Sequence, residues 1–267
     1  MSEVAGALHD GWIVTKRNLI KIKRIPDLLI FSTIQPIMFV LLFTYVFGGA
    51  IRGTGVAYKE YLMAGIFTQT VAFGSSLTAI GLADDLTKGI VDRFRSLPMS
   101  RAAVLVGRTT SDLLNNLLVV LVMGACALLV GWRVHTGPWG ALAGFGVLFL
   151  FAYAMSWIAA VIGLAARSVE VAQSAGFIWL FPMTFLSNAF ISTSTLPGWL
   201  QPVADWNPIS SIALALRDLW GNAPQGLARG DGFPAAHPVL LALLWSVGIL
   251  ALFVPMAISR YRRVSTR

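Results

Sequence analysis

The sequence predicts an all-α integral membrane protein whose chain crosses the bilayer six times. Hydrophobic residues make up 57% of the chain and charged residues only 12%, which is about half the charged share of a soluble domain. Six separate stretches are long and apolar enough to cross the hydrocarbon layer, which takes about 20 residues in a helix. Basic residues gather between these stretches, as they do in multi-pass membrane proteins.

The chain begins with an amphipathic segment, residues 6–27. Trp12 and Leu19 lie on its apolar helical face, and basic residues such as Lys16 flank that face. A basic amphipathic helix favours the plane of the membrane surface. We therefore expect an interfacial helix that ends at Pro26, and the alternative is a cytosolic helix packed on a partner.

Six apolar stretches follow as predicted membrane spans. They cover residues 29–51, 61–83, 103–131, 139–165, 171–192 and 239–258. The second stretch is the least apolar because it carries several threonines and serines and a glutamine. It is still predicted to span, because no charge lies between Tyr61 and Ala83.

The distribution of basic residues predicts the orientation of the spans. With the N-terminus inside, the cytoplasmic side carries 15 of the 20 lysines and arginines. The positive-inside rule therefore predicts that both termini are cytoplasmic, since an odd number of spans would separate the two basic ends. We expect a protein of the cell membrane whose basic residues contact anionic lipid headgroups rather than nucleic acid.

The longest predicted loop, residues 193–238, lies on the outer side. Within it, Asn207 and Pro208 match the N-cap and the first position of a helix, and apolar residues follow at helical spacing. Two helices too short to cross, at about 193–220, predict a re-entrant hairpin. Such backbone is tolerated at membrane depth only where protein buries it or where it lines a cavity. Residues 221–238 are predicted to form a surface loop.

The sequence contains no motif for nucleotide binding or catalysis. A P-loop needs a lysine followed by serine or threonine, and none of the lysines here has either neighbour. The three histidines are scattered among different loops, and none lies in a predicted span. This argues against a metal site and against an intramembrane enzyme. We therefore expect no catalytic residue, no metal and no cofactor on this chain.

The cytoplasmic loop between the second and third spans holds the most informative segment, residues 84–100. It mixes acidic, basic and apolar residues, and its apolar run stops before Pro98. A short amphipathic helix between two spans can bind in a groove on a soluble partner. The alternative is a surface turn with scattered charges.

This segment resembles the cytoplasmic loop of type-2 ATP-binding-cassette permeases of the daunorubicin-resistance type. The family pattern is a glycine, then an acidic residue, Arg, Phe or Leu, and Arg, followed by Pro-x-Ser-Arg. The matching residues are Gly89, Asp92, Arg93, Phe94, Arg95, Pro98, Ser100 and Arg101. A second family pattern, Pro-Gly-Trp-Leu-x-Pro followed by Asn-Pro, matches residues 197–202 and 207–208, and Arg217 matches a later arginine. The resemblance covers essentially the whole chain.

The resemblance implies that residues 1–267 form a single transmembrane domain with a coupling helix at 84–100. Such permeases pair as dimers of identical or related chains and dock two ATPase subunits, which bind ATP and magnesium. Arg93 and Arg95 would contact the ATPase, and Asp92 would fix the loop. We therefore expect an exporter that moves a small amphipathic drug or lipid-like molecule out of the cytoplasm or inner leaflet.

Two alternatives remain open at this point. Within the family, the cargo is an envelope polysaccharide or lipid instead of a drug. Outside it, the chain is a proton-coupled efflux carrier without an ATPase, which would need titratable groups at mid-membrane. Asp112 is the only acidic residue within a predicted span, and it lies near the cytoplasmic end.

Polar residues within spans are costly in lipid and are therefore candidates for function. Arg108, Asp112 and Asn115 lie on one stripe of the third span. They form either a structural ion pair at the headgroup level or a latch between the coupling helix and the gate. A further set of polar and aromatic residues predicts a substrate path, with helix packing as the alternative. These residues are Gln35, Gln69, Ser76, Gln173, Phe177, Thr184 and Asn188.

Overall fold

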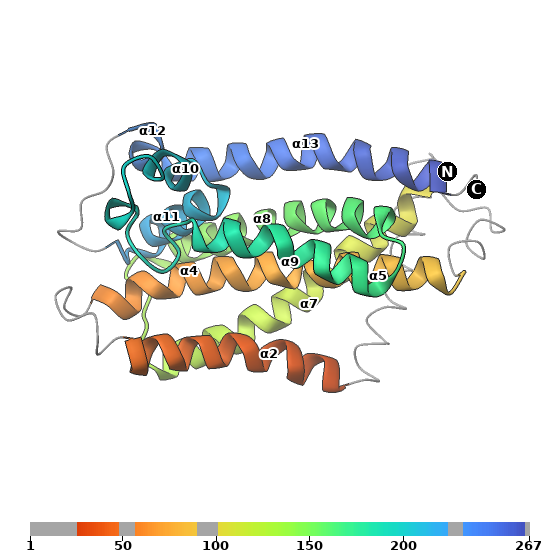
Figure 1. The fold of residues 1–267 in the computed structure, drawn as a ribbon. Coiled ribbons are helices and arrows are strands. Elements are labelled where there is room, and N and C mark those ends of the chain that lie inside the picture. The colour runs from red at the N-terminus through yellow and green to blue at the C-terminus, as the bar shows by residue number, and fades with distance from the viewer. Residues whose placement is uncertain (1–25, 48–56, 90–100, 224–231, 265–267) are drawn as a thin grey trace.

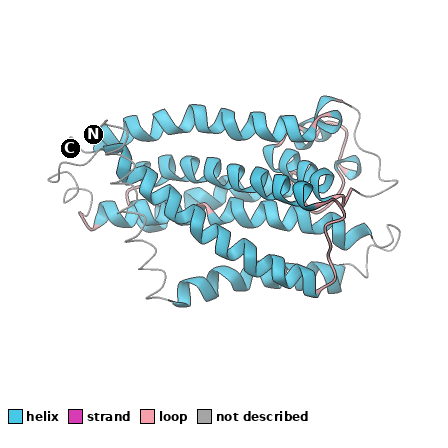
Figure 2. Cartoon of the chain, turned by 180° about the vertical axis from the view of Figure 1, so that it is seen from behind, coloured by secondary structure: helices cyan, strands magenta, loops and turns pink. Residues whose placement is uncertain are grey.

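The computed structural model describes residues 26–47, 57–89, 101–223 and 232–264, and this described part of the chain is helical without strands (Figure 1 and Figure 2). Its long helices lie side by side, and α7 crosses the others obliquely (Figure 1). The long elements are α2 Pro26–Leu41 with a π-helical extension η1 Leu42–Phe47, α4 Ala57–Gly74, α5 Ser76–Thr87, α7 Arg101–Leu129, α8 Pro138–Ala165, α9 Val169–Phe185 and α13 Pro238–Val264.

Helices coincide with all six predicted crossings, but four of them are long and apolar enough to span a membrane within the described ranges. These four run over Lys59–Thr87, Val104–Leu129, Pro138–Ala165 and Pro238–Arg263. The first of them has the lowest mean hydropathy, 1.3 against 2.0 to 2.5 for the others, as expected from its hydroxyl side chains. The other two are shorter: α9 has 17 residues, and α2 has 16 before the π-helical η1 adds six more. The six-span count stays a prediction.

The fifth helix is shorter than predicted, because α9 ends at Phe185 and not at residue 192. Pro182 lies in its last turn. The Asn207 side chain donates to the carbonyls of Met183 and Leu186, at 2.7 and 2.8 Å. A helix end leaves its last carbonyls open, and here an amide from α11 satisfies two carbonyls at this end. The chain therefore turns away before the predicted limit.

The second crossing is interrupted at Ser75, between α4 and α5. The Ser75 hydroxyl donates back to the Ala72 carbonyl at 2.6 Å, and Gly74 precedes it. Glycine–serine pairs and backward-bonding serines both favour a break in helix direction. The absence of a side chain at Gly74 matters for packing, because a Cβ there would overlap Oδ1 of Asn116 on α7.

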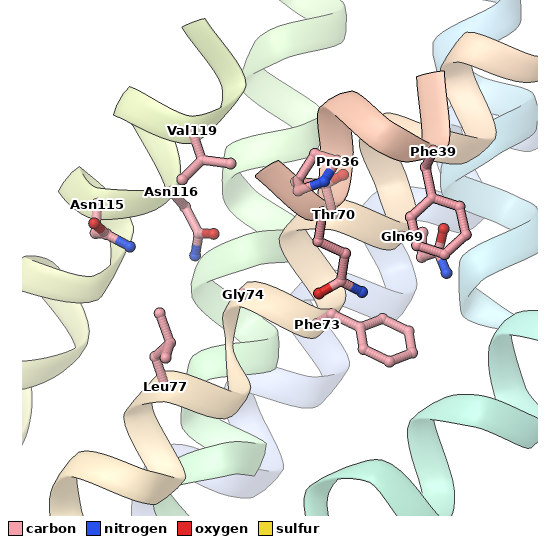
Figure 3. A pocket seen from close by; sticks show the side chains of 11 residues that line it. Pro36, Phe39, Gln69, Thr70, Phe73, Gly74, Leu77, Asn115, Asn116 and Val119 are labelled. Carbon is pink, nitrogen blue, oxygen red and sulfur yellow. The ribbon is translucent and has the colours of Figure 1, made fainter. Parts of the chain in front are cut away.

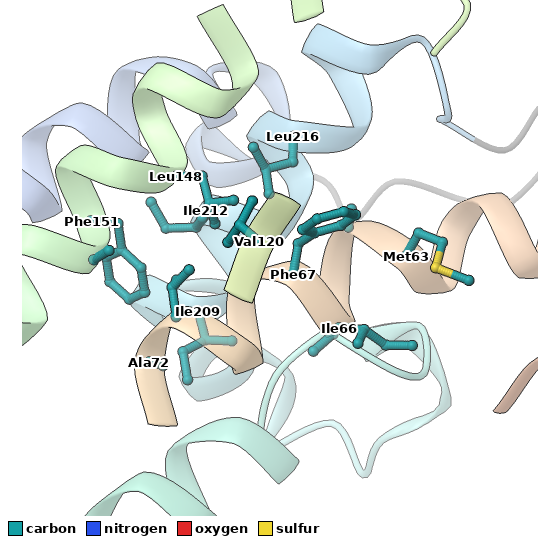
Figure 4. Close-up of a cluster of buried hydrophobic side chains, with 14 of the residues drawn as sticks. Met63, Ile66, Phe67, Ala72, Val120, Leu148, Phe151, Ile209, Ile212 and Leu216 are labelled. Atoms are coloured by element: carbon teal, nitrogen blue, oxygen red, sulfur yellow. The ribbon is translucent and has the colours of Figure 1, made fainter. Parts of the chain in front are cut away.

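The main hydrophobic core lies between α4, α7, α8 and the short helix α11 Pro208–Trp220 (Figure 4). Phe67 of α4 packs edge-on against Trp220 of α11, with ring centroids 5.2 Å apart. Trp132 and Phe145 complete this aromatic cluster. The core therefore binds α11 into the bundle instead of leaving it as an outer appendage.

The segment predicted as a re-entrant hairpin contains η2 Thr193–Thr195, α10 Gln201–Asp205 and α11. Asn207 caps α11 as predicted, because its Oδ1 accepts from the Ile209 N–H at 2.8 Å. Gly221 ends α11 with a φ of +71°, a conformation that glycine adopts without strain. Since α11 packs on α4, α8 and α13, its backbone is buried in protein, which is the condition for a re-entrant element.

One further short helix, α12 Phe233–Ala236, lies in the segment predicted as a plain surface loop. Pro234 stands at the start of this helix, where the fixed proline φ favours helix initiation. Figure 1 places α10, α11 and α12 at one end of the bundle, and the end of α13 with the turn after α5 at the other. The orientation of these two ends in a membrane stays a prediction.

Candidate functional site

A charged contact joins α7 to α5, the helix that precedes residues 90–100. Arg108 donates through Nε to Asp112 Oδ2 at 3.1 Å and through Nη2 to the Leu77 carbonyl at 3.1 Å. Its Nη1 lies 3.9 Å from Asp85 Oδ2. The Thr78 hydroxyl donates to the same Asp112 oxygen at 2.7 Å. The predicted stripe of the third span therefore holds an ion pair that also contacts the end of α5.

Local sequence explains why the guanidinium of Arg108 fits there. Gly81 of α5 faces it, and a Cβ at that position would overlap the guanidinium. The pair is mostly buried, with side-chain exposures of 16% for Arg108 and 12% for Asp112. Its geometry suits a connection between the two helices, and the role of a latch stays a prediction.

A cavity of about 130 Å³ lies beside this contact, between α2, α4, α5 and α7 (Figure 3). Its polar lining consists of Gln35, Gln69, Thr70, Asn115 and Asn116. Phe39 and Phe73 supply aromatic walls, and Pro36, Gly74, Leu77 and Val119 complete the lining. Every lining side chain is uncharged. The structure therefore brings two residues of the predicted substrate path, Gln35 and Gln69, together with Asn115 of the predicted latch.

Three amides in this lining are buried without a hydrogen bond to any described residue. They belong to Gln69, Asn115 and Asn116, which are 4%, 9% and 2% exposed. Thr70 differs, because its hydroxyl contacts Met123 Sδ at 3.3 Å. A buried polar group without a partner costs about 1–3 kcal/mol, so such groups in native proteins have a partner in protein, water or ligand.

Other residues of the predicted path lie outside this cavity. Ser76 packs under Gly176 of α9, and Gln173 is exposed on α9. Thr184 is fully buried. Phe177 contacts the cavity wall through Phe73, with ring centroids 5.8 Å apart. The predicted set is therefore divided between the cavity, the α5–α9 contact and the surface of α9.

Asn188 was predicted in the same path, but Arg217 of α11 occupies its polar groups. Arg217 donates to Asn188 Oδ1 at 3.1 Å and to the Asn188 carbonyl at 2.8 Å. It also donates to the carbonyls of Tyr61 and Ala189, and its guanidinium lies 3.5 Å from the Tyr61 ring centroid. This fully buried cation joins the start of α4, the chain after α9 and α11.

Sequence reasoning gave Arg217 no structural role, although a signal was present. Arg217 follows Ala213 by one turn and precedes Trp220 by three residues, so it lies on the apolar face of a helix. A cation on an apolar face indicates either a solvated edge or a buried polar centre. Here Arg217 is a buried polar centre, because it bonds to the carbonyls of residues 188 and 189. These residues come from a distant part of the chain, so the local sequence does not reveal this role.

Most of the predicted coupling residues lie outside the described residues. These are Asp92, Arg93, Phe94, Arg95 and Pro98, and the predicted interfacial segment lies outside as well, up to residue 25.

The described residues at the start of the predicted coupling segment, 84–89, differ from the prediction. Residues 84–87 form the last turn of α5 instead of a separate helix, and Lys88 pairs with Asp84 at 2.7 Å to extend that turn. Gly89 follows with a φ of +62°, and Arg101 begins α7. The first four residues of the predicted coupling helix, 84–87, therefore belong to α5.

Comparison with known proteins places this fold in a family. Residues 10–219 match the family model described as ABC-2 type transporter. The chain belongs to the ABC-2 type transporter family. The match covers the hairpin up to Leu219 and therefore includes both the cavity and the Arg108 contact.

Relatives of this ABC-2 protein carry permease names. The chain is 33% identical over 246 residues to the daunorubicin resistance ABC transporter permease protein DrrB1 of Streptomyces coeruleorubidus, covering 92% of this chain and 83% of that protein. It is 26% identical over 243 residues to the probable doxorubicin resistance ABC transporter permease protein DrrC of Mycobacterium tuberculosis, covering 88% and 82%. A putative transport permease, ycf38 of Cyanophora paradoxa, is 24% identical over 81% of this chain and 76% of its own length.

Proposed function

We propose that this ABC-2 permease is the membrane subunit of an ATP-driven exporter of an amphipathic drug-like or lipid-like molecule. The observation that carries the proposal is the 33% identity to a daunorubicin resistance permease over 92% of the chain. Export of a lipid or polysaccharide of the envelope is the alternative cargo within the same family.

Energy for transport comes from separate ATPase subunits in this proposal. The sequence holds no P-loop lysine, so ATP and magnesium bind to the partner. The segment after Gly89, with Arg93 and Arg95, docks in a groove of that partner. The Arg108 contact supports this reading, because it attaches α7 to α5 from Leu77 in the first turn of α5 to Asp85 in its last turn, and α5 leads into the docking segment.

Two permease chains, identical or related, form the pathway in this proposal. On α9, Ile178, Phe181 and Phe185 expose apolar side chains. Phe177, Phe181 and Phe185 also form a continuous row of ring contacts along the helix. A row of this kind suits a flat apolar cargo or the facing chain as well as lipid. Its position next to Phe73 connects it to the cavity wall.

The proton-coupled alternative receives less support from the geometry. A proton carrier needs a carboxyl group that can gain and lose a proton at mid-membrane. Asp112, the acidic residue within a predicted span, already accepts hydrogen bonds from both Arg108 and Thr78. An ion pair of this kind suits a structural or coupling role.

The test is ATP-dependent uptake of daunorubicin into inverted membrane vesicles. The permease is co-expressed with a candidate P-loop ATPase from the same organism. We expect uptake with ATP, and loss of both uptake and ATPase co-purification in the double variant Arg93→Ala, Arg95→Ala. The matched control, Arg260→Ala with Arg267→Ala, removes the same charge from the C-terminal tail and retains both. Uptake driven by a pH gradient without any ATPase would refute the proposal.

A further inference from the structure

We propose that the cavity between α2, α4, α5 and α7 binds an uncharged polar ring of the cargo within a single permease chain. This inference rests on the proposed function, since it names the part of an amphipathic cargo that the chain recognises. It adds a binding site inside one subunit to a pathway that runs between two subunits.

The buried amides carry the inference. Gln69 extends from α4, and Asn115 and Asn116 extend from α7 toward α4 and α5 (Figure 3). All three residues are more than nine-tenths buried, and none of their side chains bonds to a described residue. An amide offers both donors and an acceptor. The cavity therefore matches a ligand that carries hydroxyl and carbonyl groups.

The shape and size of the cavity limit the rest of the ligand. Phe39 and Phe73 form apolar walls from α2 and α4, and the volume is about 130 Å³. A cavity of about 150 Å³ holds one benzene ring. One six-membered ring of a larger molecule therefore fits, while the remainder lies outside, where Phe73 meets Phe177 and Phe181 of α9.

The charge of the cavity excludes ionic groups. All lining side chains are uncharged. The nearby side chains of Arg108 and Asp112 bond to each other, so neither charge is available to a ligand. A phosphate or an ammonium group would lose its hydration without gaining a counter-charge. The ring that binds here is therefore neutral.

The break between α4 and α5 gives the ring its space. Gly74 lines the cavity immediately before Ser75. A side chain at Gly74 would overlap Asn116 and displace its amide. The same feature that interrupts the helix therefore keeps the Asn116 amide in place.

The experiment compares two flat compounds that differ in polar groups. The permease–ATPase complex is placed in lipid nanodiscs, and binding of 2-(hydroxymethyl)anthraquinone, which has a free neutral hydroxyl, and of anthracene is measured by equilibrium dialysis against empty nanodiscs. We expect the hydroxylated quinone to bind at least tenfold more tightly than anthracene, because a site built for hydrogen bonding rejects an analogue that lacks the groups.

Two variants test the cavity itself. Gln69→Leu with Asn115→Leu removes two amides at nearly constant volume and is expected to weaken quinone binding about tenfold while sparing anthracene. Val119→Phe keeps every amide but fills the space, and is expected to weaken binding of both compounds. Thr110→Val, on α7 outside the cavity lining, is the matched control and should bind as the wild type does. A single symmetrical elution peak from size-exclusion chromatography shows that each variant is folded.

The outcomes separate this inference from the proposed function. Equal binding of the two compounds, unchanged binding in the Leu variant, or no quinone binding at all would overturn the inference, the last because water then satisfies the amides. If the wild type still recruits the ATPase and exports, only the cavity assignment is wrong. If the ATPase is not recruited, the proposed function fails whatever the dialysis shows.

Discussion

At the residue scale, two arginines connect helices in different ways. Arg108 pairs with a carboxylate, Asp112, and lies against Gly81. Arg217 instead donates to carbonyl oxygens, and its guanidinium lies over the Tyr61 ring. Guanidinium suits both sites because its planar fork donates in several directions at once.

We expect Arg108→Met to destabilise the folded chain by about 3 kcal/mol, because it leaves Asp112 partly buried without its cation. The double variant Arg108→Met with Asp112→Leu should recover much of that loss, since both charges are then removed. Thermal unfolding in detergent measures both variants. A double variant less stable than the single one would contradict the view that the two charges mainly compensate each other.

Arg217→Lys should strongly reduce the yield of folded protein, because an ammonium cannot reproduce the separate bonds to residues 61, 188 and 189. Tyr61→Phe is the milder comparison. It removes only the hydroxyl bond to the Asn188 carbonyl and should cost about 1 kcal/mol. Fluorescence-detected size-exclusion chromatography compares the two, and equal yields would show that the guanidinium geometry is unimportant.

At the element scale, local sequence signals predicted most helices, and long-range contacts decided the exceptions. Apolar length predicted α8 and α13, and the Asn207–Pro208 signal predicted the start of α11. The end of α9 was predicted wrongly, because the amide that caps it comes from Asn207, more than 20 residues downstream. Such a contact has no local signature.

Two substitutions at Asn207 separate its two roles. Asn207→Asp keeps the oxygen that caps α11 but loses the donors to Met183 and Leu186. Asn207→Ala loses both, and a lost N-cap alone costs about 1 kcal/mol. We expect the Ala variant to unfold at a lower temperature than the Asp variant, and the Asp variant below the wild type. An Asp variant as stable as the wild type would show that the end of α9 needs no such cap.

At the scale of the whole molecule, sequence reasoning found part of the candidate site. It selected Gln35 and Gln69 from two spans and Asn115 from a third, and these residues meet in one cavity. It assigned Asn188 to the path, although Arg217 engages that residue. Periodicity shows which residues share a helix face, but only the crossing of α7 over α4 shows which faces meet.

The predicted orientation is tested by labelling cysteines in a Cys126→Ser background. Ser194→Cys should react with a membrane-impermeant maleimide on intact cells, since the hairpin is predicted outside. Thr266→Cys should react only after permeabilisation, since the tail is predicted inside. Labelling of both positions on intact cells would contradict the single predicted span, residues 239–258, that separates them.

We predict that the chain between Gly89 and Arg101 is the contact through which an ATPase drives this permease. The most direct measurement is photocrosslinking from position 94 in membranes that contain both proteins, using Phe94→benzoylphenylalanine and, as control, Ser194→benzoylphenylalanine. The account predicts a covalent product with the ATPase from position 94 and none from position 194. No product from position 94, in a complex that still exports, would contradict it.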